Sequence, residues 1–294
     1  MKAKVRIITA MLMFGSIGLF VRWIALPSSV IALIRGIVGC VFLTGAGLAM
    51  RQPLNWKAIR KNWLMLVLSG AAIGFNWIFL FEAYRFTTVS CATLSYYFAP
   101  VFVILVSPLV LGERLTKLKL GCVAGAVLGM VLVSGVLFMG NGENDLLGIF
   151  FGLAAAVLYA SVMIFNQFMK GLSGLEMTTV QLGAAAVVLF PYTAITAFEP
   201  LAEAGITVTP TAWVLLAFVG IVHTGVGYLL YFSGMKELPA QTVAVLSYID
   251  PVTAMILSGL VLGETMTPAQ MAGAVLILGM TWLGSRPDSR ENGI

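Results

Sequence analysis

Charged side chains are scarce in this sequence: Asp, Glu, Lys and Arg together make up 10% of the 294 residues, and there is one histidine. Hydrophobic residues make up 60%, and the mean hydropathy is +1.01. A soluble domain of this length could not bury so much apolar surface, whereas a lipid bilayer solvates it. The scarcity of charge therefore excludes an ordinary soluble protein and indicates an integral membrane protein surrounded by lipid.

Signatures of metal, disulfide and nucleotide chemistry are also missing. The three cysteines, Cys40, Cys91 and Cys122, lie singly in apolar segments without CxxC or Cys/His spacing, so we expect buried thiols. There is no GxxxxGK(S/T) motif, so any pumping must draw on gradients rather than on nucleotide hydrolysis. The basic residues lie between the apolar runs rather than on one face, which argues against nucleic acid. We therefore expect no cofactor, no bound metal and no nucleic-acid partner.

Ten apolar runs are long enough to cross a membrane as helices, because about 20 residues of α-helix cover about 30 Å of hydrocarbon. The predicted spans are residues 6–26, 29–50, 62–82, 87–110, 119–139, 147–168, 175–197, 211–231, 239–260 and 268–284. The loops between them are short and leave no room for a soluble domain. The sequence thus predicts an all-α integral membrane fold of ten transmembrane helices.

The distribution of Lys and Arg predicts which ends of these spans face the cytoplasm. Of the 17 Lys and Arg residues, 14 fall at the termini and in the loops of one side, and two fall on the other. The 14 are Lys2, Lys4, Arg6, Arg51, Lys57, Arg60, Lys61, Arg114, Lys117, Lys119, Lys170, Lys236, Arg286 and Arg290, and the two are Arg22 and Arg85. Because cytoplasmic loops carry the excess of Lys and Arg, we predict cytoplasmic termini in a multi-pass protein of the bacterial plasma (inner) membrane.

The sequence also repeats itself at long range. Ser107–Thr116, SPLVLGERLT, returns 151 residues later as Ser258–Thr267, SGLVLGETMT, and 11 of 37 positions are identical between Phe81–Lys117 and Phe232–Pro268. A long period of this kind indicates a duplicated unit. Each half holds five predicted spans, and an odd number means that the two copies insert with opposite orientations. We therefore predict two five-helix repeats, residues 1–145 and 146–294, around a central cavity.

These repeated segments resemble a known family. Gly225–Gly284 is similar to the EamA repeat of the drug/metabolite transporter superfamily, whose pattern ends in a proline-bearing helix, a Leu-Gly-Glu turn and a helix of small residues. The first half carries the same features at Pro100, Leu111–Glu113 and Gly121. The resemblance covers essentially the whole chain. It implies a ten-span exporter or exchanger of amino acids, other small metabolites or xenobiotics, with a central cavity between inverted halves.

The early helices match the family pattern at fewer positions. Phe14 and Gly15 stand where the family often shows Trp-Gly. Arg35 stands where the family often shows an arginine in the second span, and Gln181 aligns with Arg35 in the second copy. An arginine common to the pattern does not by itself identify a substrate.

Asp250 is the strongest candidate for a site residue. It lies about 11 residues into its predicted span, or about 16 Å along a helix, and therefore near the middle of the membrane. Pro251 follows it and cannot donate a hydrogen bond to the Ser247 carbonyl, which predicts a kinked helix; Pro100 does the same to Tyr96. A charge at this depth is a functional candidate by default. Asp250 could bind a substrate ammonium or carry a proton, or it could be a structural acid beside the kink.

Three other titratable residues lie within spans or near their ends. Arg35 lies about 10 Å below the outer surface by helical rise, where it could bind a substrate carboxylate, pair with Glu82 or reach outward to water. Glu82 and Arg85 are three residues apart on one helical face, which favours a plain ion pair, although Glu82 is also a proton-coupling candidate. His223 could relay protons, but a lone histidine is more often a hydrogen-bonded packing residue.

Aromatic and amide side chains are candidates for the wall of the cavity. Tyr97 and Tyr248 are equivalent in the two copies and lie close to Pro100 and Pro251, so we predict that both contact the substrate. Aromatic rings offer flat apolar faces with a polar tip to amphipathic solutes, although membrane packing explains most aromatics equally well. The further candidates are Tyr96, Trp77, Asn76 and Gln181.

The sequence favours a secondary transporter over an enzyme or a channel. An integral membrane enzyme needs clustered nucleophiles, carboxylate pairs or metal ligands, which the sequence does not provide. Two inverted repeats with kinked helices favour alternating access around one fixed site, although a small-solute channel stays open as an alternative. We expect an exporter or exchanger of amino acids or related amphipathic metabolites, with drug or xenobiotic efflux as the main alternative. A proton or a counter-substrate would then supply the driving force.

Gly121, Gly125 and Gly129 form a stripe of small residues on the fifth predicted span. Such a stripe permits close approach of a second helix. Packing within the chain is favoured over packing against another copy, so we expect a monomer or a weak homodimer.

Overall fold

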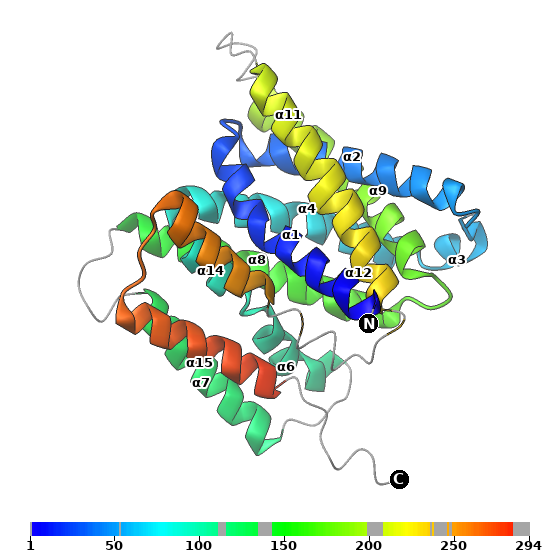
Figure 1. Cartoon of the computed structure of the whole chain (residues 1–294). Helices are drawn as coiled ribbons and strands as arrows, with labels where there is room; N and C mark the ends of the chain where they lie inside the picture. The colour runs from blue at the N-terminus through cyan, green and yellow to red at the C-terminus, as the bar shows by residue number, and fades with distance from the viewer. Residues whose placement is uncertain are drawn as a thin grey trace.

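A computed structural model describes residues 2–52, 54–110, 116–134, 143–198, 208–235, 237, 246 and 249–284 of the chain. All regular secondary structure in these residues is helical (Figure 1). The helices of the first half are α1 (Lys2–Trp23), α2 (Ser28–Ala49), α3 (Trp56–Lys61), α4 (Trp63–Phe86), α5 (Val89–Tyr96), α6 (Ala99–Val110) and α7 (Lys117–Ser134). Those of the second half are α8 (Glu143–Phe168), α9 (Gly174–Thr193), η2 (Ala194–Phe198), α11 (Pro210–Phe218), η3 (Val219–Val226), α12 (Gly227–Met235), α14 (Ile249–Leu262) and α15 (Pro268–Gly284); η2 and η3 are π-helices.

Seven helical segments in the described part of the chain are long and apolar enough to cross a membrane. They are Lys2–Trp23, Ser28–Ala49, Trp63–Phe86, Val89–Val110, Asp145–Asn166, Gly174–Phe198 and Pro210–Tyr231. The other three predicted spans overlap the shorter apolar helices Leu120–Leu132, Ile249–Leu262 and Pro268–Met280, and parts of the predicted spans 119–139 and 239–260 lie outside the described residues. The chain is therefore an all-helical, multi-pass membrane protein.

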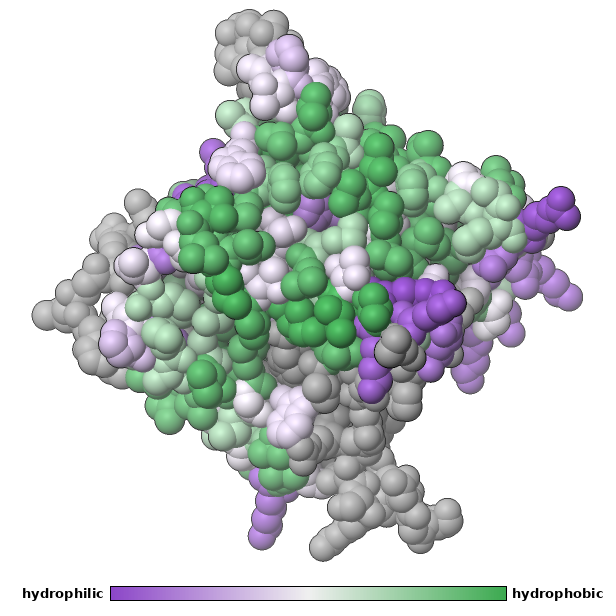
Figure 2. Space-filling model, viewed as in Figure 1, coloured by the Kyte–Doolittle hydropathy of each residue, from purple (hydrophilic) through white to green (hydrophobic). Residues whose placement is uncertain are grey.

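The surface agrees with a membrane setting. Figure 2 shows apolar residues over most of the viewed face, while hydrophilic residues gather over the start of α1 and over α3. The α3 segment is predicted as loop from the sequence, because a six-residue helix is too short to leave a clear periodic signal. Asn55 fixes where α3 begins, since its side chain accepts a hydrogen bond from the Ala58 backbone N–H at 3.2 Å.

Polar residues at the helix starts set the boundaries of several apolar helices. The Thr88 hydroxyl accepts from the Cys91 N–H at 3.1 Å and begins α5. At α9, Ser173 and Glu176 form a capping box, in which each side chain accepts from the other residue's backbone N–H. Such caps satisfy backbone N–H donors that the first turn of a helix leaves unpaired. An unpaired donor is costly in a membrane, where no water can replace the missing partner.

The fourth predicted span is divided into two helices. α5 ends at Tyr96, and α6 begins at Ala99, so that Tyr97 and Phe98 lie between them. Pro100 is in the first turn of α6, where its missing N–H removes no hydrogen bond from that helix. The break therefore places Tyr97 between two helices rather than on a continuous helical face. In the second half, Pro251 lies in the first turn of α14, directly after Asp250.

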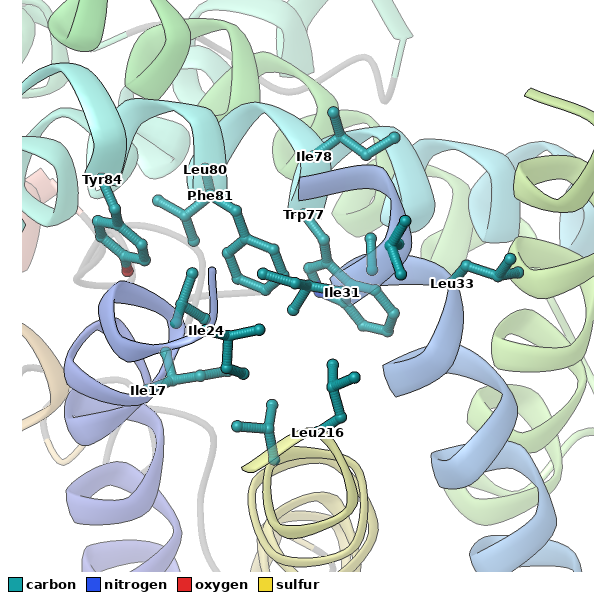
Figure 3. Close-up of a cluster of buried hydrophobic side chains, with 14 of the residues drawn as sticks. Ile17, Ile24, Ile31, Leu33, Trp77, Ile78, Leu80, Phe81, Tyr84 and Leu216 are labelled. Atoms are coloured by element: carbon teal, nitrogen blue, oxygen red, sulfur yellow. The ribbon is translucent and has the colours of Figure 1, made fainter. Parts of the chain in front are cut away.

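The helices pack in pairs that link the two halves of the chain. α4 packs against α8 and α9, α2 against α9 and η3, and α1 against α12 and α14 (Figure 1). α5 and α6 pack against α8, and α7 packs against α15. The largest buried cluster lies where α1, α2, α4 and α11 meet, and Figure 3 shows side chains from all four helices in it. Contacts between halves, rather than within them, thus dominate the core.

The glycine stripe of α7 packs within the chain, as the sequence analysis favoured. A methyl group on Gly125 would lie 2.8 Å from the Met280 side chain of α15, and one on Gly129 would lie 2.8 Å from the Gly273 carbonyl oxygen. Gly121 faces open space. Two of the three glycines therefore allow α7 and α15 to approach closely, which stabilises helix pairs where lipid removes the hydrophobic driving force.

Candidate substrate site

Two residues of opposite formal charge, the buried Arg35 of α2 and the half-buried Asp250 of α14, lie within one group of aromatic side chains. Tyr84, Tyr96 and Tyr228 are within electrostatic reach of both. Arg35 and Asp250 come from different halves of the chain, so the fold rather than the local sequence brings them near the same tyrosines. The predicted candidates Arg35, Asp250 and Tyr96 are thereby placed in one region.

Arg35 is held by neutral and aromatic groups. Its side chain is buried, its Nε donates to the Thr224 hydroxyl at 2.6 Å, and its Cζ lies 4.3 Å from the Trp77 ring centroid and 5.8 Å from that of Phe81. None of the ion pairs in the described part of the chain includes Arg35. Its burial also means that it does not reach outward to water. The aromatic faces stabilise the cation, and within the described part of the chain only the Nε of Arg35 makes a hydrogen bond.

Asp250 is the second residue of α14. The Tyr97 hydroxyl donates a hydrogen bond to its carboxylate, and Tyr159 lies within electrostatic reach. None of the ion pairs among the described residues includes Asp250 either. Tyr97 reaches the carboxylate from the break between α5 and α6. Two of the predicted candidates are thus in direct contact.

The aromatic wall extends along one face of α4. Trp77, Phe81 and Tyr84 are spaced i, i+4 and i+7, and Figure 3 shows all three pointing from α4 toward α1 and α2. Trp77 is one of the candidates predicted from the sequence, and Tyr84 is not. The helical spacing from Trp77 was the signal that could have found it.

Gly15 allows α1 to pass close to the Asp250 backbone. A methyl group at this position would lie 2.5 Å from the Asp250 carbonyl oxygen and 2.7 Å from Thr253 Cβ. The resemblance placed Gly15 in a family pattern without a physical reason. The reason in this structure is that α1 and α14 approach too closely for any larger residue.

Replacing Gly15 with alanine is expected to push α14, and Asp250 with it, away from α1. Overpacking of this kind costs about 1–3 kcal/mol, so thermal unfolding of the detergent-purified protein should shift downward by several degrees. Gly45→Ala on α2 is the matched control, because nothing lies within 4 Å of a methyl group there. Equal unfolding temperatures for the two variants would contradict the close contact.

His223 lies in the π-helix η3 and is buried. Its Nε2 is 3.0 Å from the Ser16 hydroxyl, and its ring packs against Phe20 and Phe218 with centroids 5.0 and 5.5 Å away. Its Nδ1 has no hydrogen-bond partner among the described residues. These contacts are those of a hydrogen-bonded packing residue. A role of His223 in proton coupling stays a prediction.

Asn76 and Gln181 make hydrogen bonds between helices. The Asn76 side chain donates to the Ala155 carbonyl of α8 at 2.6 Å. Gln181 of α9 donates to the Ser69 hydroxyl of α4 and to Asn166 Oδ1 of α8, both at 2.8 Å. The described contacts of both residues therefore tie α4, α8 and α9 together, and a contact with substrate stays a prediction for each.

Glu82 and Tyr248 are the remaining candidates. Glu82 accepts from Arg85 at 3.1 Å within α4, and this is the plain ion pair that the spacing favoured over a pair with Arg35. Arg85 is exposed, so solvent weakens the pair. Tyr248 lies outside the described residues. Among the described residues, no group of three or more His, Cys, Asp or Glu side chains could hold a metal ion.

Charges set among aromatic rings within the helices of a multi-pass protein are typical of membrane transport proteins, where such charges mark the solute path. The family comparison agrees. The model of the EamA-like transporter family matches residues 1–135 and again residues 146–285, and the chain belongs to this family. Its family and its relatives' names are those of transporters and not of enzymes.

Several curated proteins are similar along most of their length. An uncharacterized transporter YxxF of Bacillus subtilis is 29% identical over 280 residues, which cover 94% of this chain and 86% of the relative. A probable amino-acid metabolite efflux pump of Salmonella typhimurium is 28% identical over 73% of this chain and 74% of its own. A solved crystal structure with 21% identity covers 96% of this chain and 97% of its own at a TM-score of 0.67, which shows the fold alone.

Proposed function

We propose that this protein is a secondary transporter that exports or exchanges amino acids or closely related small metabolites across the bacterial plasma membrane. The observation that carries the proposal is the pair of opposite charges, the buried Arg35 and the half-buried Asp250, each held by neutral partners within one aromatic cluster. A zwitterion carries a carboxylate for the first and an ammonium for the second. Binding would pair both charges at once, which offsets the cost of keeping each in a membrane.

The aromatic residues suit the rest of such a solute. Trp77, Tyr84, Tyr96 and Tyr228 surround the two charges with rings that have apolar faces and, for the tyrosines, a hydroxyl tip. The similar Salmonella protein is named as a probable amino-acid metabolite efflux pump, which supports this class for the present chain. A drug or xenobiotic efflux carrier is the second candidate, because the aromatic wall alone would favour bulky apolar cations.

We further propose ten transmembrane helices in two inverted repeats, with both termini in the cytoplasm. The observed packing supports this. Two copies of one unit would match α1 with α8, α2 with α9, α4 with α11–α12, α5–α6 with α14, and α7 with α15. Exchanging the halves then turns the contact of α4 with α8 into that of α12 with α1, and the contact of α4 with α9 into that of η3 with α2. It likewise turns the contact of α5 with α8 into that of α14 with α1. The α2·α9 and α7·α15 pairs map onto themselves. All of these pairs are present, as expected for two copies of one unit.

A counterflow experiment tests the proposal. Proteoliposomes loaded with one unlabelled amino acid are diluted into a trace of the same radiolabelled compound, and a panel of amino acids, amines and carboxylic acids is compared. A secondary transporter predicts transient accumulation that saturates with concentration. Flux that rises linearly without accumulation would indicate a channel, and accumulation of aromatic cations alone would favour the efflux-carrier alternative.

A further inference from the structure

The turn between α14 and α15 makes an unexpected contact with the first half of the chain. Glu264 lies in this turn, and its side chain is 10% exposed. Its carboxylate accepts a hydrogen bond from the Val89 backbone N–H at 2.9 Å and another from the Ser258 hydroxyl. Val89 is the first residue of α5, where backbone donors lack helical partners and a negative charge is stabilised. A carboxylate of the second half therefore caps a helix of the first.

Arg22 joins the same carboxylate to two more helices. This residue lies in the last turn of α1, and its guanidinium is 3.3 Å from Glu264. It also donates to the carbonyl oxygens of Tyr84 and Thr87 at the end of α4, at 2.7 and 2.5 Å. One ion pair thus connects α1, α4, α5 and the turn after α14. In a bilayer, where lipid gives no hydrophobic drive for association, such polar links carry much of the attraction between helices.

A second link crosses between the halves beside the first. The Ser90 hydroxyl of α5 donates to the Ser258 hydroxyl of α14 at 3.0 Å, and both residues are buried. Ser90 and Thr93 are spaced i and i+3 on α5, and Tyr97, which directly follows the helix, contacts Asp250. Ser258 lies eight residues after Asp250, or about 12 Å along α14. The network therefore lies above the candidate substrate site on the two helices that border it.

We propose that Glu264, Arg22, Ser90 and Ser258 form an outer latch, which closes the path between the substrate site and the predicted outer face and must open for solute to leave. This inference rests on the alternating-access function proposed above. The latch is suited to opening because Arg22 is one-third exposed, so water can replace its contacts when α5 and α14 separate. A static cap would instead hold α5 and α14 together in every state.

Thiol labelling distinguishes a latch that opens from a static cap, and it requires no substrate. In a chain whose three native cysteines are replaced, Thr93→Cys places a near-isosteric thiol between the latch and Tyr97, where Thr93 is buried. A charged, membrane-impermeant methanethiosulfonate is added from the outside of intact cells. The latch predicts slow labelling, and adding Glu264→Gln should speed it about tenfold, since bonds to a charged group are lost.

A cross-linked variant and a matched control variant test the latch further. Ser90→Cys with Ser258→Cys should form a reducible cross-link that lowers outside labelling of Thr93→Cys below that of the unlinked chain, and reduction should restore it. Arg85→Gln is the control, because Arg85 pairs with Glu82 at the same predicted face but within a single helix. It should leave labelling unchanged.

The latch is overturned if Glu264→Gln leaves the outside labelling rate unchanged in protein that elutes as a single folded species. It is also overturned if labelling rises equally in Arg85→Gln, or if it rises only when the reagent is applied to inside-out vesicles. None of these outcomes depends on which solute is carried. A failed counterflow screen with latch-dependent labelling would therefore reject the substrate class and keep the latch.

Discussion

Replacing Asp250 with asparagine is expected to lower amino-acid counterflow at least about tenfold, because hydrogen bonds to a charged group contribute about 1.5–3 kcal/mol. Asparagine has the same size as aspartate and still accepts from the Tyr97 hydroxyl, so the fold should remain intact. What it lacks is the negative charge that would hold a substrate ammonium. The measurement is the initial rate of counterflow in proteoliposomes at several pH values.

The solute panel shows whether the loss is specific to the amine. Carboxylic acids that lack an amino group should be affected much less by Asp250→Asn than the amino acids themselves. Glu237→Gln serves as the control, because it also changes a carboxylate to an amide, but in an exposed ion pair with Arg6 that contributes little. Unchanged flux and unchanged pH dependence in Asp250→Asn would remove Asp250 from the site.

Replacing Arg35 with glutamine is expected to weaken carboxylate recognition about tenfold or more, while amines without a carboxylate are carried as before. The reason is that Trp77 and Thr224 hold the guanidinium in one orientation, which makes its terminal nitrogens a preformed fork. Arg35→Lys keeps the charge and loses the fork, so it should recover only part of the activity. Competition between labelled amino acid and unlabelled analogues measures both effects.

Thr224 offers a graded test of the same arrangement. Thr224→Val removes the 2.6 Å hydrogen bond to Arg35 Nε and keeps the shape of the side chain. It should reduce affinity less than Arg35→Gln, by about threefold to tenfold, because the guanidinium itself remains and only one bond that orients it, of about 0.5–1.5 kcal/mol, is lost. If Arg35→Gln lowers only the yield of folded protein and leaves its specific activity unchanged, Arg35 has a structural role alone.

The origin of the two charges suggests how binding and movement are coupled. Arg35 belongs to the first half of the chain and Asp250 to the second. A solute that pairs with both would draw the halves together, and its release would let them separate. Because a ligand shifts an equilibrium only through its differential affinity for the states, a bridging contact of this kind is what alternating access requires.

The membrane class, the apolar helices and the duplicated Leu-Gly-Glu turn follow from the sequence alone. Length and hydropathy suffice for long helices, because a bilayer selects for apolar runs regardless of their partners. Pro100 also marks the fourth predicted span, where the structure has a break between α5 and α6, whereas the kink predicted at Pro251 involves Ser247, which lies outside the described residues. Asp250 and Arg35 were identified for the same reason, since a charge at membrane depth is expensive wherever the helix packs.

Partners across the fold were decided only by the tertiary structure. Nothing in the local sequence shows that Arg35 contacts Trp77 and Thr224, or that Glu264 caps α5 in addition to bonding to Ser258 of its own helix. Gln181 aligns with Arg35 in the repeat, yet its described contacts join α4 to α8 and α9. Hydropathy reflects the free energy of placing each residue in lipid. Side-chain contacts depend instead on how helices far apart in the chain are rotated and paired.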